Sequence, residues 1–265
     1  MDQEILVERK YKLIKKIGEG SFGKIFEGIN INTSKKVAIK LEDINNHLML
    51  CHEAKIYKYL QKKEGIPALR SFGKAGLFYY LIVDLYDYSI GEYYKLNAKL
   101  GPKSISNLSI KMLTCIESFH KNNLIHRDIK PDNFVIDIGN KNVYIIDYGL
   151  SKLYIEDGNH IDQTTTNSIT GTFRYASINS HKNIALSRRD DLISLCYIMV
   201  YLLLGYLPWE NKKDIITIKE NFIDFCIKNI PIHLNIIKFI KYCYALEFKE
   251  DPDYIFLYKL LDSLY

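Results

Sequence analysis

Residues 126–133, which read HRDIKPDN, constrain this chain more than any other stretch. They set a carboxylate (Asp128), an ammonium group (Lys130) and a side-chain amide (Asn133) at fixed intervals. The carboxylate can accept the proton of an attacking hydroxyl, the ammonium group can neutralise a phosphoryl group in transfer, and the amide oxygen can hold Mg²⁺. An isolated His-Arg-Asp triplet is more often a solvated turn, but the full eight-residue string favours a catalytic loop.

A second segment supports this interpretation. Residues 143–149 read VYIIDYG, an apolar β run that ends in the carboxylate of Asp147 and a glycine. Mg²⁺ prefers hard oxygen donors together with substrate phosphates. Asp147 is therefore the candidate for a second metal ligand beside Asn133.

Bulk composition narrows the class of protein. The chain has 265 residues, 48% hydrophobic and 25% charged, which suits one large soluble domain or two tightly joined lobes. A net charge of +5 is too slight to argue for a nucleic-acid partner. The five cysteines are widely spaced and suggest neither disulfides nor zinc, and neither a leader nor a membrane-length apolar run is evident. We expect an intracellular protein of the cytoplasm or nucleus, with no nucleic-acid and no membrane partner.

The N-terminal part predicts a nucleotide-binding hairpin. Residues 18–25 read GEGSFGKI between two apolar segments, and glycines let a backbone approach phosphates closely. Dinucleotide folds use a similar pattern, but there a helix follows the third glycine. Residues 24–29 alternate like a strand, which favours a flap over ATP phosphates, with an ordinary hairpin as the alternative.

The next motif, VAIK at residues 37–40, predicts a strand whose Lys40 reaches the α- and β-phosphates. Glu53 lies thirteen residues later in a helical run and can pair with that lysine, unless it is a solvated helix-face charge. Strands are expected at residues 68–72 and 77–84, and backbone groups of residues 84–86 could bind an adenine edge. Helices are expected at 104–121 and across 215–265, and a mobile loop at 156–170.

Together these residues resemble eukaryotic protein kinases and, within them, the casein kinase I family. The narrower resemblance rests on EAKIYK from residue 53, GTFRYASIN from 171, SRRDDL from 187, LPW from 207 and DPDY from 251. The sequence SIN at 177–179 stands where most kinases carry Ala-Pro-Glu. The resemblance spans nearly the whole chain.

The resemblance implies an α+β, two-lobed kinase-like fold: one kinase domain over residues 1–265, with an antiparallel N-lobe to about residue 84, a hinge at 84–87 and a mainly helical C-lobe from 88. It implies an ATP- and Mg²⁺-dependent serine/threonine protein kinase that acts on proteins, with ATP in the cleft between the lobes. We expect the protein to be a monomer. Lys130, two residues after the catalytic Asp128, is typical of serine/threonine kinases. Nucleotide contacts are expected from Ile17, Gly18, Gly20, Ser21, Gly23, Ile25, Ala38, Lys40, Glu53, Asp84, Leu85, Tyr86 and Val135.

The expected substrate segment includes Thr172 and Arg174. Relatives use an arginine here and a lysine after the Pro-Trp pair, for which Lys219 is the candidate, to bind acidic or pre-phosphorylated substrates. The alternative for Arg174 is a structural pair with a nearby carboxylate. Phe173 stands where the family has a small residue, and Tyr148 where most kinases have phenylalanine.

Two other functions remain open from the sequence. A pseudokinase scaffold would bind nucleotide without turnover, although every position that pseudokinases commonly lose is present. A small-molecule kinase would share the lobes, but residues 130–131 and 171–179 favour a protein substrate.

Overall fold

The protein is described by a computed structural model over residues 6–20, 23–45, 49–97, 100–139, 141–230 and 233–262. The chain divides into two units, which we describe separately. The first comprises Met1–Asp87 with Ile146–Gly149, and the second comprises Tyr88–Ile145 with Leu150–Tyr265. A short segment of the chain, which includes Asp147, therefore returns to the first unit.

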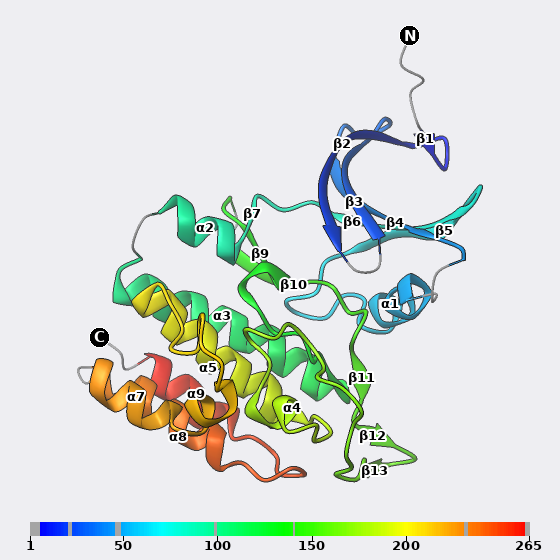
Figure 1. The fold of residues 1–265 in the computed structure, drawn as a ribbon. Helices are drawn as coiled ribbons and strands as arrows, with labels where there is room; N and C mark the ends of the chain where they lie inside the picture. Colours follow the sequence, from blue (N-terminus) through cyan, green and yellow to red (C-terminus); the bar gives the residue numbers. More distant parts are fainter. Residues whose placement is uncertain are drawn as a thin grey trace. The chain divides into compact units, whose positions relative to one another are not determined.

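The first unit is built on a six-stranded antiparallel sheet in the order β1-β2-β3-β4-β6-β5 (Figure 1). Its strands are β1 (Leu6–Val7), β2 (Tyr11–Gly20), β3 (Gly23–Asn30), β4 (Lys36–Asp43), β5 (Leu69–Ala75) and β6 (Phe78–Asp84). Side chains alternate between the two faces of a strand, so one face collects a core that includes Tyr11, Ile39 and Ile82. The expected strand at residues 68–72 is longer than predicted, because the turn at Gly76 lets Ala75 pair with Phe78.

Helix α1 (Met49–Tyr59) packs against β5 and β6. Its start is fixed by Glu42, a buried residue whose Oε2 accepts a hydrogen bond of 2.8 Å from the backbone N–H of Leu50. The first N–H groups of a helix have no partner within the helix, so this contact stabilises the helix end. The same helix buries Glu53 at 3% exposure together with Ala54 and Tyr57.

The second unit is mainly helical and is centred on α5 (Arg188–Leu204), which is buried along most of its length. It packs against α3 (Pro102–Lys121) and α8 (Leu234–Ala245), and α3 also packs against α9 (Tyr254–Asp262). The expected helix at residues 104–121 thus begins two residues earlier, with Pro102 in its first turn. The remaining helices are α2 (Ile90–Leu96), α4 (Ile178–His181), α6 (Ile215–Glu220) and α7 (Phe222–Asn229).

Short strands join these helices. Three of them, β7 (Tyr88–Ser89), β9 (Phe134–Asp137) and β10 (Asn142–Ile145), form a sheet in the order β10-β9-β7. The others form two pairs: β8 (Leu124–Ile125) with β11 (Lys152–Leu153), and β12 (Ile155–Glu156) with β13 (Asn159–His160). The composition of residues 156–170 predicts a mobile loop. The structure shows that this segment begins in the β12–β13 pair and that Thr165 bridges to Ile184. No helix in the described parts of the chain is long and apolar enough to cross a membrane.

Candidate active site

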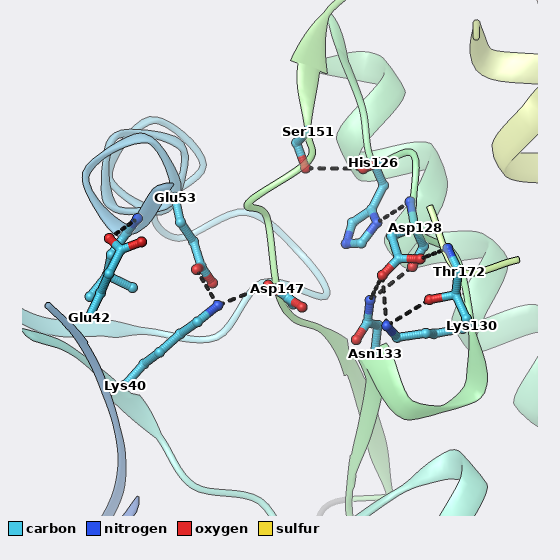
Figure 2. Close-up of polar contacts among 11 residues, drawn as sticks. Lys40, Glu42, Glu53, His126, Asp128, Lys130, Asn133, Asp147, Ser151 and Thr172 are labelled. Atoms are coloured by element: carbon cyan, nitrogen blue, oxygen red, sulfur yellow. Dashed lines mark hydrogen bonds and ion pairs between the residues drawn. The ribbon is translucent and has the colours of Figure 1, made fainter. Parts of the chain in front are cut away.

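In the first unit, the expected pair of Lys40 and Glu53 is formed, and Asp147 joins it (Figure 2). Lys40 extends from β4, and its Nζ lies 2.7 Å from Glu53 Oε2 on α1 and 3.0 Å from Asp147 Oδ1. Burial disfavours the ammonium form, but the two carboxylates outweigh burial and raise the pKa of Lys40. The lysine is therefore a fixed cation, held in place by a buried glutamate.

Tyr148, next to Asp147, is fully buried and packs on α1. The centre of its ring lies 4.1 Å from that of Tyr57. Asp147 itself has a φ of 67°, a left-handed conformation that is uncommon outside glycine. The buried ring beside it fixes the local backbone and so directs the carboxylate toward Lys40.

The glycine-rich hairpin has the expected form. Strands β2 and β3 pair through Gly18 with Ile25 and through Gly20 with Gly23, so a strand and not a helix follows the third glycine. A side chain at Gly23 would place its Cβ 2.2 Å from the carbonyl oxygen of Leu41, which only glycine avoids. Ser21, an expected nucleotide contact, lies outside the described residues.

Of the remaining expected nucleotide contacts, five lie in the first unit and one in the second. Ala38 is on β4, between Glu27 and Val83 of the neighbouring strands. Asp84 ends β6, and its carboxylate accepts two hydrogen bonds from Arg70, at 2.7 and 2.8 Å. This ion pair, which the sequence analysis missed, fixes the start of the segment that contains Leu85 and Tyr86. Ile17 is on β2 of the first unit and Val135 on β9 of the second.

In the second unit, the HRDIKPDN stretch forms a loop between β8 and a 3-10 turn at Pro131–Asn133. Asp128 is 8% exposed and is the centre of the polar contacts (Figure 2). Its Oδ2 accepts hydrogen bonds from Lys130 Nζ at 2.7 Å and from Asn133 Nδ2 at 3.2 Å. Its Oδ1 accepts one from the backbone N–H of Thr172 at 2.6 Å. The three predicted catalytic-loop residues thus come together around one carboxylate.

The backbone of this loop is held by Asp191 on α5. The carboxylate of Asp191 accepts hydrogen bonds from the backbone N–H groups of His126 at 2.7 Å and Arg127 at 2.9 Å, and from His120 Nε2 at 3.0 Å. Burial raises the pKa of this carboxyl, but the hydrogen bonds from the two histidines outweigh burial and lower it, so Asp191 is ionised. Sequence analysis missed this role. Arg127 has a φ of 70°, a strained conformation that these contacts can maintain.

The expected substrate segment is joined directly to the catalytic loop. The hydroxyl of Thr172 accepts a hydrogen bond of 2.9 Å from Lys130 Nζ. Gly171 has a φ of 89°, and a Cβ at this position would lie 2.5 Å from the carbonyl oxygen of Arg127. Glycine is therefore required for residues 171–176 to approach the loop this closely.

Both residues of the expected anion pocket, Arg174 and Lys219, have partners within the protein. The guanidinium of Arg174 pairs with Glu210, which is the structural alternative left open by the sequence. Lys219 is fully buried, and its Nζ donates to the carbonyl oxygens of Ala176 at 2.5 Å and Phe173 at 3.4 Å. Burial lowers the pKa of Lys219 to about 7. The expectation that Lys219 presents a cation to the substrate is corrected: the lysine is buried and binds the backbone of residues 173–176.

Two residues, one in each unit, each offer a donor atom that suits Mg²⁺. Asn133 uses its Nδ2 to donate to the backbone oxygen of Asp128 at 2.9 Å, which leaves its side-chain oxygen as the atom suited to a cation. Asp147 offers a carboxylate. Within the described residues, no group of three or more His, Cys, Asp and Glu side chains is placed to hold a metal unaided. Mg²⁺ at phosphoryl-transfer sites takes only one or two protein side chains and completes its coordination with substrate phosphates and water.

A comparison with known families agrees with this geometry. The model described as the protein kinase domain matches residues 11–252, which is most of the chain. This match, with the antiparallel N-terminal sheet and the helical second unit, confirms the predicted α+β kinase-like fold. The family implies a phosphotransferase that takes ATP, typically with Mg²⁺, and acts on protein substrates. On its motifs, its fold and this match, the chain belongs to the protein kinase domain family.

Proposed function

We propose that this protein is an active serine/threonine protein kinase that transfers the γ-phosphate of ATP to hydroxyl groups of protein substrates. The observation that carries the proposal is the contact of Lys130 with both Asp128 and Thr172, at 2.7 and 2.9 Å. It joins a base, a cation and the expected substrate segment in one network. All three lie in the same unit of the structure.

Each residue has a role in the proposed reaction. Asp128 accepts the proton of the acceptor hydroxyl, and Lys130 stabilises the charge of the phosphoryl group in transfer. Lys40, held by Glu53, binds the nucleotide phosphates. Asn133 and Asp147 would hold Mg²⁺, which supplies charge neutralisation at the phosphates when it is bound.

The serine/threonine preference is supported by Lys130, which stands two residues after the base as in serine/threonine kinases. The test is a peptide array on which otherwise identical peptides offer serine, threonine or tyrosine as the acceptor. Phosphorylation of serine and threonine peptides, lost in Asp128→Asn, is the expected result. A tyrosine preference would refute this part of the proposal. Nucleotide binding without phosphorylation of any peptide would support the pseudokinase alternative.

We extend the proposal to substrates that carry an acidic or phosphorylated residue a few positions before the acceptor, as in casein kinase I. The support is the resemblance in residues 171–179 and the guanidinium of Arg174, whose side chain is 39% exposed and so can be reached from solvent. Arginine's planar fork suits phosphate. The same array, with aspartate or phosphoserine placed at each position before the acceptor, tests this preference.

The proposed setting is the cytoplasm or nucleus, with the protein acting as a monomer and without nucleic acid or membrane. The intracellular setting is supported by the five cysteines, none of which forms a disulfide in the structure. Unpaired cysteines are common in reducing compartments. Size-exclusion chromatography with light scattering tests the monomer, and imaging of the tagged protein tests the compartment.

A further inference from the structure

The side chain of Arg174 is already engaged by an internal anion, Glu210. One guanidinium nitrogen pairs with Glu210 Oε1, and the same oxygen accepts a hydrogen bond of 2.9 Å from the backbone N–H of Leu207. The guanidinium also lies over the ring of Tyr201, 4.7 Å from its centre. Trp209 Nε1 donates to the carbonyl oxygen of Arg174 at 2.8 Å. Glu210 is therefore held at the arginine by its own turn.

The pair is accessible to a competing ligand. The side chains of Arg174 and Glu210 are 39% and 31% exposed, which differs from the buried pair of Lys40 and Glu53 at 14% and 4%. An exposed ion pair contributes little to stability, because water screens both charges. A stronger anion can therefore displace Glu210 from the guanidinium at modest cost.

A peptide carboxylate is a poor competitor in this exchange. It offers Arg174 the same chemical group as Glu210. Its binding also loses entropy of association, whereas Glu210 belongs to the same chain and loses none. A phosphate group carries a charge of about −1.5 to −2 and three acceptor oxygens, so it gains more from the guanidinium than a carboxylate does.

We propose that Glu210 is a specificity-determining residue that restricts this site to phosphorylated substrates and excludes those that offer only aspartate or glutamate. The inference rests on the proposed function of the segment at residues 171–176 as the substrate platform. It also narrows that function, because acidic and pre-phosphorylated peptides are no longer equivalent. Lys219 does not add a second positive charge that could attract acidic peptides to this site, since its ammonium group is buried against backbone carbonyls.

The test compares three peptides that are identical except for phosphoserine, aspartate or alanine at the preferred position before the acceptor. The variant is Glu210→Gln, which removes the charge but keeps an oxygen that can accept from the N–H of Leu207. The matched control is Glu220→Gln, which makes the same charge change in the exposed pair of Glu220 with Lys182, 2.6 Å apart. Circular dichroism and thermal unfolding confirm that both variants fold.

In the wild-type protein, kcat/KM is expected to be clearly higher for the phosphoserine peptide, with aspartate close to alanine. In Glu210→Gln, the ratio of aspartate to alanine should rise about 2- to 5-fold, the range expected for the loss of an exposed competing charge. In Glu220→Gln the ratio should stay at the wild-type value. A wild-type protein that uses aspartate as well as phosphoserine, or an unchanged ratio in folded Glu210→Gln, overturns the inference.

Binding measured by fluorescence anisotropy separates this inference from the proposed function. If the wild-type protein phosphorylates none of the peptides, the proposed function fails. The phosphoserine peptide should then still bind more tightly than the aspartate peptide, and Glu210→Gln should still gain affinity for the aspartate peptide. Equal binding of all three peptides by both proteins, or no binding by either, overturns the inference about Glu210.

Discussion

Acid should destabilise the second unit through His181, which lies beneath the substrate segment. Its Nε2 faces Lys219 Nζ at 3.0 Å and the carbonyl oxygen of Phe173 at 3.2 Å, and its ring packs edge-on against that of Phe173. Burial and the ammonium group of Lys219 lower the pKa of His181 from 6.5 to about 4. Between these two pH values, His181 of the unfolded chain binds a proton that His181 of the folded protein does not bind.

The sign and the size of the effect follow from linkage. Between pH 6.5 and pH 4, the unfolded state binds more protons at this residue than the folded state does, so the free energy of unfolding falls as the pH falls. A separation of about 2.5 pH units, at about 1.36 kcal/mol per unit, sets a full loss of about 3 kcal/mol. At about pH 5 the loss relative to neutral pH should already be about 2 kcal/mol.

The assay is urea unfolding followed by the fluorescence of Trp209. This is the only tryptophan of the chain, and Lys219 Nζ lies 4.6 Å from the centre of its ring. The signal therefore reports on the region around His181. His181→Phe keeps a ring against Phe173 and removes the titrating nitrogen, so it should lose about 2 kcal/mol less than the wild type between pH 7 and pH 5. Equal losses in the two proteins would refute the reasoning, because other titrating groups are common to both.

Four further outcomes are expected. Asp128→Asn should lower kcat on the order of a hundredfold or more and leave nucleotide affinity nearly unchanged, because the base acts in the chemical step; single-turnover kinetics and nucleotide titration check this. Asp147→Ala should abolish the dependence of nucleotide affinity on Mg²⁺, which titration at varied Mg²⁺ measures. Gly171→Ala should lower activity strongly without loss of nucleotide binding, since its Cβ would lie 2.5 Å from the carbonyl oxygen of Arg127. The matched change Gly158→Ala, where the added Cβ meets nothing within 4 Å, should lower activity much less. Protein made in bacteria and stripped by a phosphatase should remain active on peptides, and a need for an upstream kinase would contradict this.

The catalytic loop was predictable because its chemistry is local in sequence. Asp128, Lys130 and Asn133 lie within six residues, and a short turn brings their side chains to one carboxylate. The pair of Lys40 and Glu53 was predictable for a related reason, since the helix that follows the Lys40 strand must pack its apolar face on the same sheet, where it contacts β5 and β6. In both cases, the spacing along the chain limits the geometry to few alternatives.

The supports of the site were not predictable from spacing. Asp191 reaches the backbone of His126 across 65 residues, and Lys219 reaches that of Ala176 across 43. Asp191 is on the buried helix α5 and Lys219 is on the short helix α6, and only the packing of distant elements decides which groups each charge contacts. No local pattern distinguishes Lys219 from the solvated lysines of the same region.

The same limit applies to Arg174. The sequence contains an arginine in the right segment but does not show whether its charge is available, because that depends on Glu210, 36 residues away. Lys40 and Arg174 are both paired cations, yet the consequences differ. The partner of Lys40 is a buried glutamate that water does not reach, so this pair serves as a fixed support. The partner of Arg174 is partly exposed and on a turn, so a stronger anion can replace it. A cation in a buried pair, such as Lys40, positions a ligand. A cation in an exposed pair, such as Arg174, selects among ligands, because each ligand must displace the carboxylate that is already bound.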